Sequence, residues 1–326
     1  MPDPLDPRAL PRAPATTGAT RSDLHGILWM LISCALLSGV AALGRHAALA
    51  GVPLLQIVFL RLAFAVLAMA PILAHRGRGM LRTPHLRLYT LRVAMGLVAM
   101  TSWFAAISLA PIGEATAIAF LMPLLATMGA ALFLGETVGW RRWGAIVVGF
   151  LGALVILRPG IAEASPGALI AVFSALAMAA ASLMIKQLAD RDHPDTVVLI
   201  TLLMQTVVML LPGLWVWQPL TAELWLVMAC MGLFGMLGHI TLARALRAAD
   251  ASVVMGIDFA RLPFAVLFGW LLFGELIDIW TWIGAGIIFG SAFYTARRER
   301  RLAQSSGSES VQPAAPVASS KPPDPP

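Results

Sequence analysis

The segment from Gly26 to Ala296 is almost continuously apolar, and this feature limits the folds open to the 326-residue chain more than any other. Hydrophobic residues make up 59% of the sequence and charged residues 12%, whereas soluble proteins carry roughly 25% charged residues. Such an excess of apolar surface must face something other than water. The composition therefore excludes a water-soluble fold and predicts an all-α membrane protein.

The apolar segment has room for ten membrane-spanning helices, because each crossing of the hydrocarbon core needs about 20 apolar residues. We expect spans at 26–44, 54–74, 88–109, 114–134, 141–158, 167–186, 195–217, 223–243, 252–273 and 279–296. The two ends of the chain, 1–23 and 298–326, are rich in Pro, Ala, Ser and charged residues. We expect both ends to be disordered tails.

Basic residues are distributed unevenly between the two sides of the membrane. With the N-terminus in the cytoplasm, nineteen of the 23 Lys and Arg residues fall in cytoplasmic segments. Arg45 and Arg158 fall outside, and two more lie within spans. This positive-inside bias predicts that both termini are cytoplasmic. It also explains the net charge of +6 without nucleic acid as a partner, since the basic residues are scattered over loops. The excess of Arg over Lys is typical of a GC-rich bacterial genome, so we expect a bacterial inner-membrane protein.

Two halves of the chain match one another at a spacing of about 140 residues. The matching pairs are Gly26/Gly167, Ser33/Ser174, Arg45/Lys186, Ala106/Ala245, Ala110/Ala249, Pro123/Pro263, Trp143/Trp282 and Phe150/Phe289. Each half, 26–158 and 167–296, holds five spans, and this odd number makes the second half enter the membrane from the opposite side. Many secondary transporters use such inverted repeats, because two similar halves give inward-open and outward-open states of comparable energy.

The chain is similar to the drug/metabolite transporter superfamily, and in particular to its EamA-type branch of ten-helix carriers. The similarity covers residues 26–296 and rests on the doubled five-span unit, the proline in each fourth span and the Gly-Glu pair after it: Pro123 with Gly135-Glu136, and Pro263 with Gly274-Glu275. It implies a carrier that moves small metabolites, including amino acids and related compounds, through a central cavity between the halves. It also implies that spans five and ten support the bundle outside that cavity.

Asp258 and Arg261 are charged residues near the middle of the ninth span, where a charge costs about 2.5–3.5 kcal/mol on insertion scales. Their spacing places them on one helix face, and Pro263 follows closely. Two interpretations are open. Either the pair binds a zwitterion, with Asp258 at its ammonium and Arg261 at its carboxylate, or the two side chains neutralise each other and fix the helix against its neighbours.

Three further residues are candidates for the substrate site. Arg61, buried in the second span, either lines the outer half of the cavity or extends toward the outer surface. We expect no direct contact between Arg61 and Asp258, because their depths differ by roughly 11 Å. His239, deep in the eighth span, is either a proton carrier or a hydrogen-bond partner of a neighbouring helix. Trp103 in the third span either stacks on a substrate or packs in the bundle.

The prolines and glutamates of the repeat have different expected roles. Pro123 and Pro263 are expected to break their helices and to act in gating beside the substrate, because proline cannot continue the helical hydrogen-bond ladder. Glu136 and Glu275 come just before spans five and ten, and the electrostatics of a helix start explain both adequately.

Other classes of function find little support in the sequence. Neither H-E-x-x-H nor G-x-S-x-G occurs, and a P-loop is missing. The two cysteines, Cys34 and Cys230, cannot supply a four-ligand zinc site. An intramembrane lipid-modifying enzyme or a channel is the alternative to our main expectation, which is a secondary transporter without enzymatic activity, cofactor or metal. We expect it to move an amino acid or a related zwitterionic compound through the lipid bilayer by alternating access, with coupling to protons and oligomeric state left open.

Overall fold

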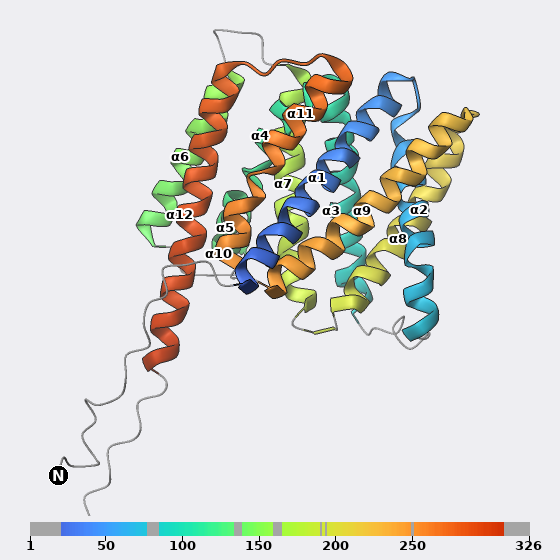
Figure 1. The fold of residues 1–326 in the computed structure, drawn as a ribbon. Helices are drawn as coiled ribbons and strands as arrows, with labels where there is room; N and C mark the ends of the chain where they lie inside the picture. The colour runs from blue at the N-terminus through green and yellow to red at the C-terminus, as the bar shows by residue number, and fades with distance from the viewer. Residues whose placement is uncertain are drawn as a thin grey trace, which may run out of the picture.

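The computed structural model describes residues 21–76, 85–133, 139–158, 165–189, 191–192, 194–248 and 251–309, and the regular structure in these ranges is entirely helical. The helices are α1 (Arg21–Leu49), α2 (Leu54–Arg76), α3 (Leu86–Leu109), α4 (Ile112–Ala119), α5 (Met122–Phe133), α6 (Trp140–Leu157), α7 (Pro166–Ala189), α8 (Pro194–Trp215), α9 (Ala222–Ala248), α10 (Ala251–Asp258), α11 (Arg261–Phe273) and α12 (Ile279–Glu309). They form one bundle (Figure 1).

Helices occupy all ten of the expected spans. Eight segments are long and apolar enough to cross a membrane, and Leu54–Ala70 and Ile279–Thr295 add two shorter apolar helices. The expected all-α membrane fold is therefore confirmed. Residues 1–20 and 310–326 of the expected tails lie outside the described residues, as does Glu136. The helix α12 continues to Glu309, so the expected C-terminal tail begins as helix rather than as irregular chain.

The fourth and ninth spans are each broken into two helices. Phe120 and Leu121 separate α4 from α5, and Phe259 and Ala260 separate α10 from α11. At both breaks the amide groups bond three residues back instead of four. The Leu121 N–H donates to Ile118 O at 2.9 Å, and the Ala260 N–H donates to Ile257 O at 2.8 Å. A proline lies in the first turn of each following helix, where it has no N–H with which to continue the ladder.

Contacts between the helices repeat in the same way as the sequence. The helix α1 packs on α9 and α11, and its counterpart in the second half, α7, packs on α3 and α5. One hydrogen bond is repeated as well. Ser33 Oγ donates to Gly238 O at 2.8 Å, and its counterpart Ser174 Oγ donates to Ala99 O at 3.0 Å. The sequence repeat is thus matched by a repeated set of interhelical contacts.

The helices α6 and α12, which are spans five and ten, lie side by side at one edge of the bundle (left in Figure 1). Their backbones approach closely at Gly152 and Gly284. A Cβ atom added at Gly152 would lie 2.9 Å from Gly284 O, and one added at Gly284 would lie 2.5 Å from Gly152 O. Neither position can carry a side chain unless the two helices move apart.

We expect Gly152→Val to lower the free energy of unfolding by about 1–3 kcal/mol, because the new side chain forces the α6–α12 crossing open. Thermal unfolding of the detergent-purified protein measures the loss. Gly286→Ala in α12 is the matched control, since nothing lies within 4 Å of a Cβ there and alanine favours a helix. Equal losses in both variants would contradict the close crossing.

Candidate substrate site

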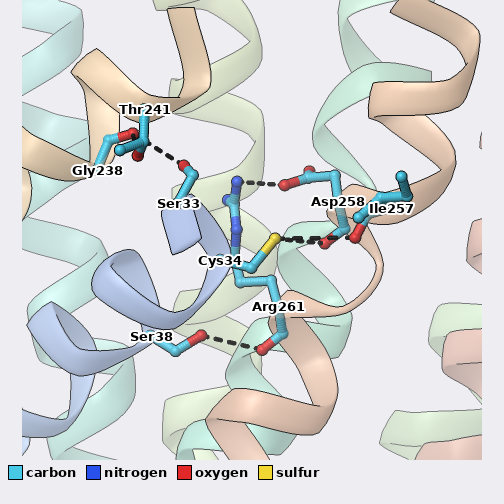
Figure 2. Close-up of polar contacts among 8 residues, drawn as sticks. All are labelled: Ser33, Cys34, Ser38, Gly238, Thr241, Ile257, Asp258 and Arg261. Carbon is cyan, nitrogen blue, oxygen red and sulfur yellow. Dashed lines mark hydrogen bonds and ion pairs between the residues drawn. The ribbon is translucent and has the colours of Figure 1, made fainter. Parts of the chain in front are cut away.

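Asp258 and Arg261 flank the break in the ninth span (Figure 2). Asp258 is the last residue of α10 and Arg261 is the first of α11. The spacing of the two residues predicts one continuous helix face, but the break separates them. Arg261 Nη2 nevertheless lies 2.5 Å from Asp258 Oδ1. The aspartate side chain is 30% exposed and the arginine side chain 33%. The break therefore carries an ion pair that borders accessible space.

The first helix, α1, holds this break in place. Because Leu262 N–H donates to Phe259 O, the carbonyl of Asp258 loses its usual helical donor. Cys34 Sγ lies 3.8 Å from Asp258 O and also 3.8 Å from Ile257 O. One turn along α1, Ser38 Oγ donates to Arg261 O at 3.0 Å, as Figure 2 shows. Polar groups of α1 thus bond the backbone on both sides of the break.

Arg61 extends from α2 toward α3 and α9. Its Nη1 lies 3.0 Å from Met100 Sδ, and its guanidinium carbon lies 5.7 Å from the ring centroid of Phe104. A Cβ at Gly235 of α9 would lie 3.3 Å from Arg61 Nη2. No carboxylate pairs with Arg61 within the described ranges, Asp258 included. A cation therefore lies in the bundle with only a weak sulfur acceptor and an aromatic face beside it.

His239 belongs to α9, which packs on both α1 and α2. It follows Gly235 by four residues, so it shares the face of α9 that is turned toward Arg61. Arg61 and Arg261 both act on it electrostatically, yet its side chain is exposed. The structure thus places both Arg61 and Arg261 within electrostatic reach of His239.

Trp103 is not part of that polar group. It is partly buried and packs against the main apolar core. Pro123 lies in the first turn of α5, and Pro263 in the first turn of α11. Both prolines are therefore placed at the helix breaks.

A row of four phenylalanines connects the two breaks to α12. Phe120 of the first break and Phe259 of the second have ring centroids 5.4 Å apart. Phe289 lies 4.3 Å from Phe259, and Phe293 lies 5.8 Å from Phe289. All four rings are partly exposed. Sequence reasoning missed this row, because its members follow no local motif and belong to three spans. One of these is span ten, which the family resemblance implied lies outside the cavity.

A second ion pair, which is more deeply buried, joins the two halves at the end of the bundle where α1 ends. Arg45, near the end of α1, pairs with Glu275 in the link between α11 and α12, and the two side chains are 13% and 11% exposed. The Arg45 guanidinium also donates to Ile107 O and Ala110 O at the end of α3. Glu275 Oε2 accepts the Ile112 N–H, at the start of α4, at 3.0 Å.

The Arg45–Glu275 pair stabilises the ends of two helices. Terminal carbonyls attract cations and terminal N–H groups attract anions, so Arg45 stabilises the end of α3 and Glu275 the start of α4. The expectation that Glu275 serves the start of its own following helix is therefore wrong, since it lies outside the first turn of α12 and accepts the Ile112 N–H instead. One sequence feature could have indicated this partner of Glu275. Arg45 is a basic residue on the outer side of the membrane, where the positive-inside pattern leaves few basic residues.

Comparisons with known proteins agree with this architecture. A model of the EamA-like transporter family matches residues 24–158 and again residues 165–297. A riboflavin transporter of Vibrio cholerae is 36% identical over 86% of this chain and 98% of its own length. A riboflavin transporter of Rhizobium johnstonii is 32% identical over 85% of this chain and 92% of its own. An S-adenosylmethionine uptake transporter of Rickettsia conorii is 27% identical over 87% of this chain and 96% of its own.

The family model covers nearly all of the described helices, and it matches once in each half of the inverted repeat. Both halves carry a broken span; Asp258 and Arg261 flank the second break, and Phe120 and Phe259 lie one at each break. The chain is therefore a multi-pass membrane protein that belongs to the EamA-like transporter family.

Proposed function

We propose that the protein moves a small metabolite with a planar aromatic ring, such as a flavin, across the bacterial inner membrane by alternating access. The observation that carries this proposal is the row of Phe120, Phe259, Phe289 and Phe293 at the two helix breaks. Planar rings stack on such side chains, and aromatic pairs contribute about 0.5–1.5 kcal/mol in addition to the free energy gained from the apolar area they bury. Two relatives named as riboflavin transporters support the same substrate class.

The charges near the breaks support an uncharged ligand. Asp258 and Arg261 already satisfy each other at 2.5 Å, so an ammonium or carboxylate group would have to break that pair in order to bind. A neutral ring system needs only hydrogen-bonding groups at its edge, and Arg61 and His239 carry such donors. In this proposal Asp258 and Arg261 hold the break, while Arg61 and His239 contact the substrate.

Alternating access requires that the two ends of the bundle close in turn. The Arg45–Glu275 pair connects α1, α3 and α4 of the first half to the α11–α12 link of the second half. With both termini in the cytoplasm, as the basic residues favour, this contact closes the periplasmic end. Outward opening then requires the pair to separate, and the breaks at Pro123 and Pro263 let half-helices tilt. His239 is the candidate proton carrier for transport driven by a proton gradient.

A zwitterionic substrate is the second candidate. It follows from the mid-span charges of Asp258 and Arg261, and the relative named as an S-adenosylmethionine uptake transporter supports it, because S-adenosylmethionine carries an amino-acid group. The two candidates differ in one requirement: only the zwitterion needs the ion pair to open.

Thermal unfolding of the detergent-purified protein with riboflavin, S-adenosylmethionine or a neutral amino acid tests the choice. We expect riboflavin to raise the melting temperature, since a ligand at 100 times its Kd adds about 2.7 kcal/mol. Phe259→Leu keeps an apolar side chain but removes the ring, and we expect it to weaken riboflavin binding about threefold to tenfold.

Phe133→Leu is the matched control, because Phe133 at the end of α5 is 82% exposed and lies outside the aromatic row. Its riboflavin affinity is expected to equal that of the wild type. Stabilisation by S-adenosylmethionine or the amino acid, without any effect of riboflavin, would instead support the zwitterionic substrate. Uptake of the stabilising compound into proteoliposomes then establishes transport.

A further inference from the structure

The helices α6 and α12 run antiparallel along the edge of the bundle that they form together (Figure 1). Gly152 of α6 faces Gly284 of α12, and a Cβ added at Gly149 would lie 2.8 Å from Ser291 Oγ. Moving back toward the start of α6 therefore leads forward along α12. The first turn of α6 and the part of α12 that follows Ser291 lie at the same end of this edge.

Both helices are rich in arginine at that end. Arg141 and Arg142 lie in the first turn of α6, which holds no acidic residue. In α12, residues 297–301 are four arginines and one glutamate, and this stretch is helical. Arg141 and Arg297 are exposed, and neither pairs with a carboxylate among the residues that the structure describes. Because like charges on neighbouring helices repel, an anion from outside the chain stabilises this group.

The depth of the arginines matches that of phospholipid headgroups. Trp280 and Trp282 at the start of α12 are exposed, as is typical of aromatic residues at a membrane interface. From Trp280 to Arg297 the helix rises by about 26 Å at 1.5 Å per residue, close to the hydrocarbon thickness of about 30 Å. Trp140 on α6 is exposed at the opposite interface, and the Arg141 guanidinium carbon lies 5.3 Å from its ring centroid. The arginines are therefore placed level with the phosphates of one leaflet.

We propose that the arginines in the first turn of α6 and at 297–301 of α12 bind the phosphate of an anionic phospholipid such as phosphatidylglycerol. Arginine suits this partner because its planar group donates two parallel hydrogen bonds to a phosphate. Exposed apolar side chains of the same edge, Val147 and Leu151 among them, offer the acyl chains a surface. With both termini in the cytoplasm, as the basic residues favour, the lipid belongs to the inner leaflet. Its binding does not depend on which metabolite the protein moves.

The test is thermal unfolding of the delipidated, detergent-purified protein, titrated with phosphatidylglycerol and separately with phosphatidylcholine of the same acyl chains. We expect phosphatidylglycerol to raise the melting temperature by several degrees and phosphatidylcholine to have a much smaller effect. One arginine near an anionic lipid surface changes the affinity about fivefold. Arg141→Gln and Arg297→Gln should therefore each raise the half-saturating concentration of phosphatidylglycerol about fivefold, and Arg297→Lys should keep most of the affinity.

Arg87→Gln is the matched control, because Arg87 is an exposed arginine on α3, which packs mainly on α7. A response to phosphatidylglycerol that weakens in Arg141→Gln and Arg297→Gln but not in Arg87→Gln supports the proposal. Equal weakening in all three variants overturns it, since the lipid would then respond only to net positive charge. Equal responses of the wild type to the two lipids, or none to phosphatidylglycerol, overturn it as well.

Light scattering on the same samples tests a second copy of the chain as the occupant of this edge. If Arg297→Gln separates a dimer into monomers and leaves the response to phosphatidylglycerol unchanged, the partner of the arginines is protein rather than lipid. That result also overturns the proposal. If the oligomeric state is the same in the wild type and Arg297→Gln while the lipid response differs, the lipid is the partner.

Discussion

Glu275→Gln is expected to lower the free energy of unfolding by about 3–5 kcal/mol, the range seen when one partner of a buried ion pair is removed. The substitution leaves the Arg45 guanidinium, only 13% exposed, without its anion. It also replaces a charged acceptor of the Ile112 N–H, at the start of α4, by a neutral one. Thermal or denaturant unfolding in detergent measures the effect.

The same link between α11 and α12 offers a matched control. Asp278 pairs with Arg158 at 2.7 Å, but these side chains are 42% and 32% exposed. Exposed pairs contribute about 0–1 kcal/mol, so Asp278→Asn should change stability far less than Glu275→Gln. If Asp278→Asn lowers the free energy of unfolding as much as Glu275→Gln does, any substitution in the link destabilises the protein. Burial of the Arg45–Glu275 pair would then not explain the effect of Glu275→Gln.

A double variant separates the ion pair from the helix ends that it serves. Replacing both members of a buried pair by apolar residues is often close to neutral, so Arg45→Met with Glu275→Leu should recover much of the stability. The carbonyls of Ile107 and Ala110 and the N–H of Ile112 still lose their partners. We therefore expect recovery to stay incomplete by about 1–3 kcal/mol, the cost of unsatisfied polar groups.

The spans could be predicted from the sequence because each depends on local composition. A run of about 20 apolar residues specifies a crossing whatever it packs against, and Pro123 and Pro263 mark helix breaks through their own missing N–H groups. The repeat was visible for the same reason, since the matched residues occur in the same order in each half.

The contacts at the site could not be predicted, because they depend on how distant segments meet. Glu275 caps α4 rather than the helix that follows it, and nothing within a few residues of Glu275 indicates this. The spacing of Asp258 and Arg261 suggested one helix face, but the break falls between them. Arg61 and His239 belong to different halves of the chain, and only the packing of α2 on α9 brings them near each other.

Arg261→Gln is expected to impair both folding and transport, because it leaves the Asp258 carboxylate alone at membrane depth beside a broken helix. The loss of stability should be about 1–3 kcal/mol, smaller than for Glu275, since these side chains are about one third exposed. Unfolding in detergent and uptake into proteoliposomes measure the two effects on one preparation.

Asp258→Asn combined with Arg261→Gln then distinguishes a pair that holds the break from a pair that binds substrate. The double variant has no unpaired charge, and an amide can still bond an amide across the break, so stability should return in either case. If the pair only fixes the break between α10 and α11, uptake returns with stability, which is what a neutral aromatic substrate requires. If stability returns while uptake stays more than tenfold below wild type, the charges contact the substrate. The zwitterion would then replace the flavin as the substrate class, because only a ligand with its own charges needs both residues ionised.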